Sequence, residues 1–178
     1  MAKNTKINIF RGLCRLFEAH SLDDITVTML VEECGISRQT FYYHFSDIES
    51  LLRWGIEQGT QGCVKRANQA SDMREATLLF LSTVDRGHDT IIKMLNSSYS
   101  GYVTVLIKES VLQYITNYAI TIKGESFVNT RDSKFLLTFI ADGITGGILS
   151  AFYENRHIDV EAATDALTSL VFEKYITE

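Results

Sequence analysis

The residues best suited to chemistry form one short run, Ser37 to Phe45, which combines hydrogen-bond donors with aromatic rings and contains no carboxylate. Within it, Arg38 can read guanine O6 and N7 through two hydrogen bonds, and Gln39 can read adenine N6 and N7 in the same way. At about 100° per residue, Phe41 and Phe45 fall on one side of a helix and face a core. The separate arc of about 140° holds Arg38, Gln39, Tyr42 and Tyr43. This pattern predicts a surface that reads DNA bases.

A second interpretation of this run is an amphipathic surface helix whose polar side is solvated. Two adjacent tyrosines argue against it, because a bare surface has little use for them. The hydroxyl and imidazole groups of Thr40, Tyr42 and His44 suit phosphate oxygens, which set the register of a protein on DNA without reading its sequence. The spacing alone leaves both interpretations open.

The elements that must position these groups are three helices with short connections. Apolar residues recur at three- and four-residue steps from Ile7 to Phe17, which indicates one helical face. Thr26 is a good N-cap for a helix over 27–34, and Gly35 is a C-cap for its end. Since only Gly35 to Ser37 separates this helix from the next, over 38–45, the pair is a helix-turn-helix candidate. Its second helix would lie in the major groove.

A fourth helix is predicted to open on Ser46-Asp47-Ile48-Glu49, an S-x-x-E capping box, and to end near Asn68. Beyond it, helical spacing continues over 72–84, 87–97, 101–122, 132–155 and 159–176. We therefore predict an all-α protein of about nine helices. Its helix-turn-helix DNA-binding domain would span 1–46, and a helical bundle for dimerisation and for binding an effector or partner would span 47–178.

The stretch Ile25 to Leu52, ITVTMLVEECGISRQTFYYHFSDIESLL, resembles the DNA-binding signature of the TetR family of transcriptional regulators. The resemblance is close over residues 7–54 and looser over the whole chain. It implies that Thr40, Tyr42 and His44 contact the DNA backbone and that Arg38, Gln39 and Tyr43 read bases. Thr26 and Thr28 would add phosphate or base contacts.

The chain departs from this family at Ile48, where the family usually has a lysine. The change removes a phosphate contact at each half-site, so we expect weaker or less salt-sensitive binding; Ile48 would instead dock against the first three helices. The Phe-x-Asp-Ile variant at 45–48, the short C-terminal body and the run FIADGITGGI at 139–148 resemble the subgroup that contains activators of dihydroxyacetone kinase operons.

Charge patterning supports a basic face at the N-terminus. Residues 1–15 contain four basic residues and no acidic one: Lys3, Lys6, Arg11 and Arg15. Lys6 is the one that we expect to contact DNA. Residues 1–55 contain six basic and seven acidic residues, so a basic face requires that folding separate the two kinds. The acidic residues that have to point away from phosphate are Asp23, Asp24, Glu32 and Glu33.

The C-terminal body offers candidates for an interface and for a pocket. Gly143 and Gly147 have a small-xxx-small spacing that permits close helix approach, and apolar residues lie nearby. The predicted dimer interface comprises Gly143, Gly147, Phe152, Leu167, Leu170 and Val171. Packing of the same residues inside one chain is equally compatible with the pattern. The candidates for an effector pocket are Phe80, Met94, Tyr102, Tyr114, Tyr118, Phe139 and Asp142. Ordinary core packing is the alternative for these aromatics, while a carboxylate buried at Asp142 would need a partner.

Composition excludes several classes of protein. The 178 residues include no proline, where average usage would place roughly nine, and this favours long helices. With 46% hydrophobic residues the chain is not disordered, and a net charge of −5 excludes a generally basic nucleic-acid binder. Three cysteines without a CxxC pair support neither disulfides nor zinc. We therefore expect no metal and no cofactor.

One apolar stretch, 135–153, is long enough to suggest a membrane span. A carboxylate at its centre, Asp142, and several Gly, Thr and Ser residues favour a buried helix of a cytoplasmic protein instead. No phosphate-binding loop, HExxH or nucleophile motif is present, so we expect no enzyme and no catalytic residue.

These observations together predict a sequence-specific, dimeric regulator on a pseudo-palindromic operator, a repressor controlled by a small-molecule effector. The alternative is a DNA-bound adaptor or activator whose body binds another protein. A cavity of several hundred Å³ in the body would favour the effector, and a filled body would favour the adaptor.

Overall fold

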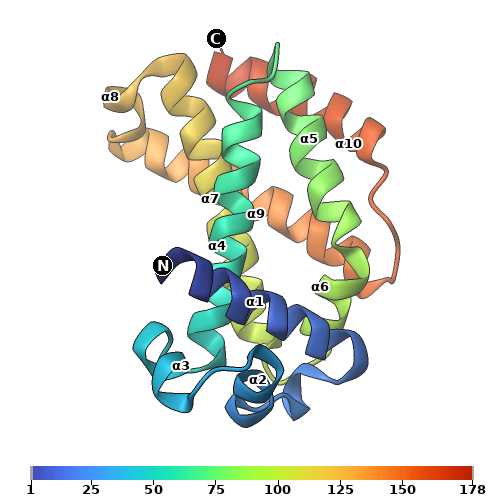
Figure 1. Cartoon of the computed structure of the whole chain (residues 1–178). Helices are drawn as coiled ribbons and strands as arrows, with labels where there is room; N and C mark the ends of the chain where they lie inside the picture. Colours follow the sequence, from blue (N-terminus) through green and yellow to red (C-terminus); the bar gives the residue numbers. More distant parts are fainter. Residues whose placement is uncertain (1, 178) are drawn as a thin grey trace.

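The computed structural model describes residues 2–177, which form ten α-helices and two short helical segments of other types. Figure 1 shows a small N-terminal unit, α1 to α3, below a larger bundle. The helices are α1 (Ala2–Ala19), α2 (Val27–Cys34), α3 (Arg38–His44), α4 (Ile48–Ala67), α5 (Met73–Arg86), α6 (His88–Leu95), α7 (Ser100–Lys123), α8 (Glu125–Val128), α9 (Arg131–Tyr153) and α10 (Val160–Leu167). A 3₁₀ turn, η1 (Leu22–Asp24), follows α1, and a π-helical segment, η2 (Thr168–Thr177), follows α10. The prediction of an all-α chain is confirmed.

The helix-turn-helix forms through the predicted caps. The Thr26 side chain accepts from the Met29 N–H at 3.3 Å and begins α2. Gly35 ends α2 with φ of 62°, a left-handed conformation that glycine adopts without steric cost. Ser37 accepts from the Thr40 N–H at 3.0 Å and begins α3. Each cap satisfies a backbone group that the helix end would otherwise leave unpaired, so the turn geometry is specified locally.

Two helix boundaries differ from the prediction. The N-cap of α4 is Asp47, which accepts from the Ser50 N–H at 2.7 Å while Ser50 Oγ accepts from the Asp47 N–H at 3.2 Å. The predicted box of Ser46 with Glu49 is therefore wrong by one residue, because a carboxylate and a hydroxyl one position later form the same reciprocal pair. The predicted single helix over 159–176 is α10 followed by the wider turns of η2. Asp159 does cap it, accepting from the Ala162 N–H at 3.1 Å.

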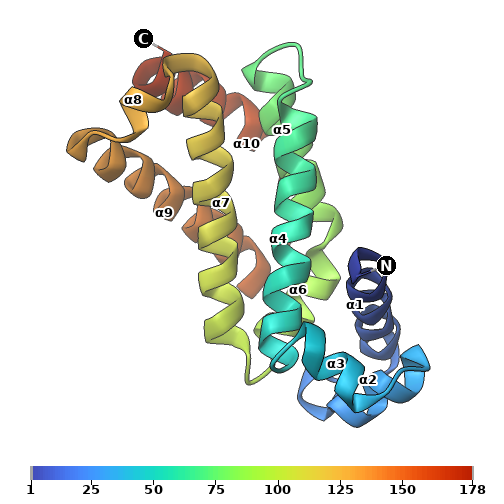
Figure 2. The same cartoon turned by 60° about the vertical axis from the view of Figure 1, so that its left-hand side comes forward.

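The described residues form two hydrophobic cores, and α4 contributes to both. The small core lies among α1 to α3 and the start of α4, with Phe41, Leu51 and Ile9 fully buried. The large core fills the bundle of α4 to α10 and η2. Figure 2 shows α4 running from the N-terminal unit along the full height of the bundle, beside α7. Movement of α4 in the bundle is therefore passed directly to the N-terminal unit.

Close helix packing holds α1 in place. A Cβ built on Gly12 would lie 2.3 Å from Cys34 Sγ, so α1 and α2 approach at a glycine. A Cβ on Gly55 would lie 1.9 Å from the ring of Phe10, so α4 approaches α1 in the same way. A side chain at either position would require Cys34 or the Phe10 ring to move.

Polar contacts join the N-terminal unit to the bundle. The Asp23 carboxylate accepts from the Ser98 N–H at 3.0 Å and from Ser98 Oγ at 2.6 Å, which ties η1 to the turn between α6 and α7. Within the bundle, Arg53 on α4 donates to the Tyr102 hydroxyl at 3.1 Å and to Glu109 at 2.6 Å, which joins α4 to α7. Sequence reasoning did not find this connection, because each contact joins residues about fifty or more positions apart.

Candidate nucleic-acid interface

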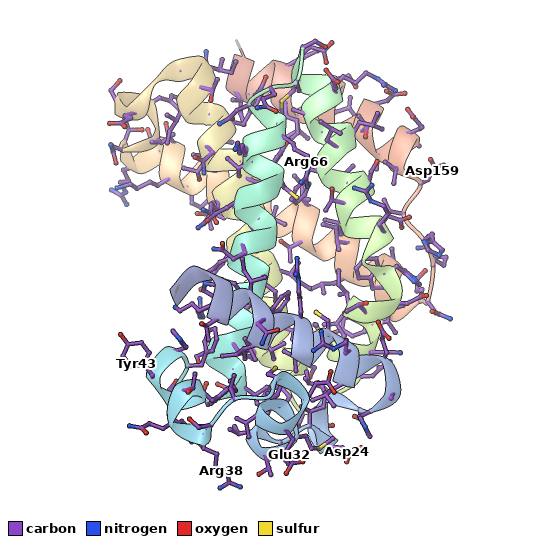
Figure 3. The ribbon with its side chains drawn as sticks, viewed as in Figure 1. Asp24, Glu32, Arg38, Tyr43, Arg66 and Asp159 are labelled. Carbon is purple, nitrogen blue, oxygen red and sulfur yellow. The ribbon has the colours of Figure 1, made fainter. Side chains whose placement is uncertain are left out.

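Helix α3 presents its polar arc to solvent and its phenylalanines to the small core. Phe41 is fully buried, whereas Tyr42 is 56% and Tyr43 is 81% exposed. Arg38 and Gln39 are exposed too. In Figure 3, Arg38 and Tyr43 extend outward from the end of the molecule that lies farthest from the bundle. The arc that the sequence predicts is thus an open surface, free to enter a groove of DNA.

A side-chain bond joins the two helices of the motif. Arg38 Nη2 donates to Thr28 Oγ1 at 2.6 Å, so the guanidinium lies across the start of α2. Thr40 is half-buried, and its hydroxyl is 2.9 Å from Ser37 Oγ. Thr26 uses its hydroxyl as a cap, although its side chain is exposed. The predicted hydroxyls therefore gather at the N-terminal ends of α2 and α3, where backbone N–H groups also favour phosphate.

The C-terminal end of α3 is covered from α1. Lys6 Nζ lies 5.2 Å from the centre of the Phe45 ring, which places a positive charge beside α3. His44 is half-buried, with the Tyr43 ring edge-on at 4.9 Å. Lys3, the remaining basic residue of this stretch before Arg11, lies outside the described side chains. Lys6 and His44 thus flank the open arc on one side.

Two of the acidic residues that had to be kept away from phosphate have partners. Glu33 is paired with Arg15 on α1, and Asp23 is bound to Ser98. Asp24 and Glu32 are exposed, and Figure 3 places both at the same end of the molecule as Arg38. Folding therefore gives partners to only two of these four acidic residues. The exposed carboxylates of Asp24 and Glu32 oppose non-specific attraction to DNA.

Ile48 lies in the small core, where it is 8% exposed. Its side chain packs with residues of α1 to α3 at the first turn of α4. The expectation that it docks against the first three helices is confirmed. The apolar residue here attaches the first turn of α4 to the helix-turn-helix.

The bundle holds an apolar cavity of about 330 Å³ between α4, α5, α6 and α7, with one residue of α9 in its wall. Phe80 and Met94, two of the predicted pocket residues, line it. The lining also includes Thr60, Ile107 and Ser110, which the prediction did not contain. These were missed because aliphatic and small polar side chains carry no signal in sequence that separates a cavity wall from a packed core.

The other predicted pocket residues do not line this cavity. Tyr114 is buried and stacks on Phe80, with ring centres 4.3 Å apart, and its burial raises the pKa of the phenol. Tyr102 bonds Arg53, and Tyr118 packs near Phe172.

For Phe139 and Asp142 the prediction of a pocket is wrong. Phe139 is 69% exposed, and Asp142 pairs with Lys108 at 2.7 Å on the surface with 48% of its side chain exposed. Both faces of α9 are apolar, so the sequence did not reveal which one turns inward.

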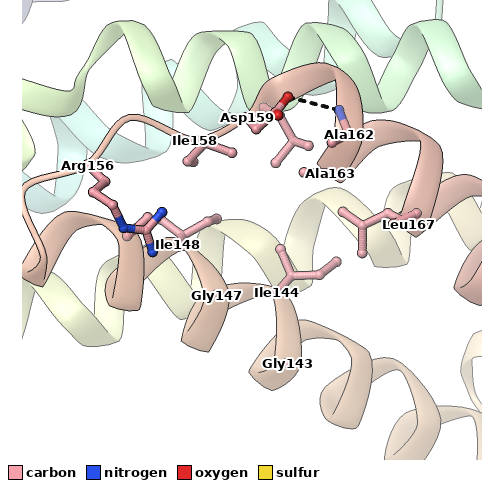
Figure 4. A pocket seen from close by; sticks show the side chains of 13 residues that line it. Gly143, Ile144, Gly147, Ile148, Arg156, Ile158, Asp159, Ala162, Ala163 and Leu167 are labelled. Carbon is pink, nitrogen blue, oxygen red and sulfur yellow. Dashed lines mark hydrogen bonds between the residues drawn. The ribbon is translucent and has the colours of Figure 1, made fainter.

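The predicted interface residues fall into two groups. Gly143, Gly147 and Leu167 line an open groove of about 420 Å³ between α9 and α10, shown in Figure 4, and Leu170 is 68% exposed. Val171 is half-buried against the large core. Phe152 is 2% exposed and packs edge-on against His88, so the prediction that it meets a partner is wrong. It faces inward because it lies on the same side of α9 as Ile148 and Ala141.

Helix α9 is the one helix of the described chain that is long and apolar enough to cross a membrane, by length and composition only. Only 39% of its most apolar window is buried. The expectation of a buried helix holds for one face only: that face packs on the bundle, and the other carries Phe135, Phe139 and three glycines in the open. Among the described residues, no group of three or more His, Cys, Asp and Glu side chains could hold a metal ion.

Comparison with known proteins agrees with this arrangement. Residues 9–53 match the sequence model of the family described as bacterial regulatory proteins, tetR family. No curated protein matches the chain. Among solved structures, the dihydroxyacetone kinase operon activator DhaS is similar, with a TM-score of 0.63 and 17% identity over 96% of this chain and 95% of that one. The TetR family repressor AlkX from Dietzia sp. strain DQ12-45-1b, implicated in biodegradation of n-alkanes, gives a TM-score of 0.58 and 13% identity, over 97% of each chain. The fold is thus shared over almost the whole length.

Proposed function

We propose that the chain is a DNA-binding transcriptional regulator of the TetR family and that it works as a homodimeric repressor on a pseudo-palindromic operator, released by a small molecule in the cavity of the bundle. Each protomer would place α3 in the major groove of one half-site. Arg38, Gln39 and Tyr43 would read bases, while Lys6, Thr40 and His44 would hold phosphates. We propose that it acts in the cytoplasm and, like regulators of this family generally, is not an enzyme.

The open face of α9 supports the dimer. Phe135 and Phe139 stack with ring centres 6.4 Å apart and are 75% and 69% exposed, and Tyr153 at the other end is 63% exposed. From Phe135 to Tyr153 this face spans about 27 Å, at 1.5 Å per residue. Exposed aromatic side chains at both ends of this face, with the Asp142–Lys108 pair between them, indicate an interaction site. A second copy would cover it.

The arrangement of this face suits a two-fold axis. Nothing lies within 4 Å of a Cβ built on Gly143, Gly146 or Gly147, so a second helix can approach the backbone there. In an antiparallel pair of α9 helices centred on Gly143, Phe139 of one protomer would meet Gly147 of the other. The Phe139 ring of each protomer then fills the space beside Gly147 of the other, and the two-fold axis makes this contact occur twice.

The position of the cavity supports control by an effector. Met94 lines the cavity and also packs against the small core, so one side chain contacts both. The turn after α6 holds Ser98, which binds Asp23 of the N-terminal unit. A ligand that displaces α6 would therefore move η1 relative to α4. That movement changes the distance between the two α3 helices of a dimer. It therefore weakens binding to an operator whose half-sites are a fixed distance apart.

Selection of bound DNA from a random pool tests this proposal. We expect a consensus with dyad symmetry, together with a mass in light scattering that equals two chains. A consensus without symmetry, from a monomer in solution, would refute the dimer. The open face of α9 would then favour the second candidate function, an adaptor that binds another protein through Phe135 and Phe139.

A further inference from the structure

We propose that the cavity between α4 and α7 binds a small, uncharged and largely apolar molecule that carries one hydrogen-bond acceptor, held by the hydroxyl of Ser110. This inference rests on the proposed function, because it names the class of effector. It depends on the chemistry of the cavity wall and on the Ser110 hydroxyl, which has no acceptor among the residues that the structure describes.

The wall of the cavity excludes charge. Its lining is formed by aliphatic, aromatic and small polar side chains, among them Ile91, Met94, Ile107 and Phe80, and it includes no Asp, Glu, Lys or Arg. A charged ligand would lose its hydration here without gaining an ionic partner. A molecule with many hydroxyls would leave most of them unpaired, at a similar cost for each.

Two arginines contact residues of the lining from outside the cavity. Arg86 Nη2 donates to Thr83 Oγ1 at 3.1 Å, and the Arg86 side chain is exposed and forms no part of the lining. Arg66 Nη2 donates to Cys63 Sγ at 3.3 Å, across one turn of α4. The Arg66 side chain is itself exposed and forms no part of the lining. Water therefore solvates its charge, and the thiol lies between it and the cavity.

The wall has four hydroxyls. Thr83 donates to the Leu79 carbonyl at 2.8 Å and Thr90 is exposed, whereas Thr60 and Ser110 form a pair on facing helices. Thr60 on α4 is buried, and its one hydroxyl proton has two acceptors within reach, the Ile56 carbonyl at 3.0 Å and Ser110 Oγ on α7 at 2.8 Å. In this pair Ser110 is the acceptor, and its own proton has no acceptor among the described residues. Both hydroxyls border the cavity. A carbonyl, ether or ester oxygen in the cavity would complete the chain from Thr60 through Ser110 to the ligand.

The size of the cavity completes the description of the ligand. Its volume of about 330 Å³ is at the lower end of the range for small-molecule sites, about 300–1,000 Å³. A single aromatic or short aliphatic ketone, ether or ester meets all three requirements: size, lack of charge and one acceptor.

Calorimetric titration of the full chain with four matched probes tests this inference. Acetophenone, cumene and benzoate have the same number of non-hydrogen atoms and nearly the same shape, but carry a carbonyl, no polar group and a negative charge; glycerol represents polyols. We expect acetophenone to bind most tightly, cumene more weakly, and benzoate and glycerol not detectably. Binding of benzoate or glycerol as tight as that of acetophenone would overturn the proposal.

Two variants separate the hydroxyl from the cavity. Ser110→Ala should weaken acetophenone about three- to tenfold, the value of one hydrogen bond, and leave cumene unchanged. Equal weakening of both would mean that Ser110 only supports the wall. Gly59→Leu places a side chain at the cavity, where nothing lies within 4 Å of its Cβ, and should abolish binding of both. Gly101→Leu, equally open but outside the cavity, is the matched control and should bind both normally.

The failure of this inference and that of the proposed function are distinguishable. If Gly59→Leu binds acetophenone as tightly as the unmodified chain, the cavity is not the site and the inference fails, regardless of the result of the DNA-binding experiment. If acetophenone binds as expected but leaves the affinity for the selected operator unchanged, the ligand class stands and control of DNA binding by the cavity is refuted.

Discussion

Replacement of Arg38 by alanine tests the base-reading role of α3 most directly. Arginine that forms two hydrogen bonds to guanine discriminates against other bases by about 1–3 kcal/mol. In the free protein Arg38 already donates to Thr28 at 2.6 Å, and release of that bond costs about 1 kcal/mol. The net contribution is then at most about 2 kcal/mol for each half-site. For two half-sites, Arg38→Ala should weaken operator binding by up to about 4 kcal/mol, or up to about 700-fold.

The assay is fluorescence anisotropy with the selected operator and with operators changed at one base pair in each half-site. Arg38→Ala should bind all of them with similar affinity, because the discriminating contact is lost. Arg38→Lys keeps the charge without the planar fork and should also lose the preference while it retains more of the affinity. An Arg38→Ala variant with unchanged affinity and unchanged preference would refute the placement of α3 in the groove.

Lys6→Ala provides the contrasting control. A phosphate contact contributes equally to every sequence, so this variant should weaken all operators alike. It should make the dependence of log affinity on log salt concentration shallower by about 1.8 for a dimer, since each lost contact changes the slope by about 0.9. A change of base preference in Lys6→Ala would contradict the separation of phosphate and base contacts.

Three further predictions concern α4 and α9. Ile48→Lys restores the residue usual in the family but removes apolar burial at the small core, so it should lower the free energy of unfolding by about 1–3 kcal/mol in thermal melts; an equally stable variant would contradict the docking of Ile48. Asp47→Ala should destabilise by about 0.5–2 kcal/mol, because it removes the cap of α4. The bond from the Ser50 N–H lowers the pKa of Asp47, so part of this stabilisation is complete above about pH 5 and is lost as the pH falls below the ordinary aspartate value of about 3.9 and through the lowered pKa of the folded state; the difference from the unmodified chain should be smaller at pH 3 than at pH 7, and a constant difference would count against it. Phe139→Arg should convert dimers to monomers in sedimentation experiments without loss of helical content, whereas a stable dimer of this variant would place the interface elsewhere.

The helix-turn-helix at the N-terminal end of the molecule could be predicted because its signals are local. Thr26, Gly35 and Ser37 act on backbone groups within a few residues of themselves, and the alternation of Phe41 with Tyr42 and Tyr43 follows from helical geometry alone. The boundary at Asp47 was missed by one residue, since several neighbouring side chains can cap the same helix.

The bundle was harder to predict because its helices are apolar on more than one side. On α9, Phe139 and Phe152 look alike in sequence, yet one is 69% and the other 2% exposed. Which face turns inward depends on the packing of α7 and α6 against α9, which involves residues far away in the chain.

The sequence by itself determined the all-α class, the helix-turn-helix with its caps, and the exposed polar arc that contains Arg38 and Tyr43, because each of these depends on interactions within a turn or two of helix. Only the tertiary structure decided the pairing of Asp142 with Lys108, the bond from Asp23 to Ser98, the cavity with its Thr60–Ser110 pair, and the open face of α9. These features arise where helices distant in sequence meet, and helical periodicity does not specify which helices meet or at what angle.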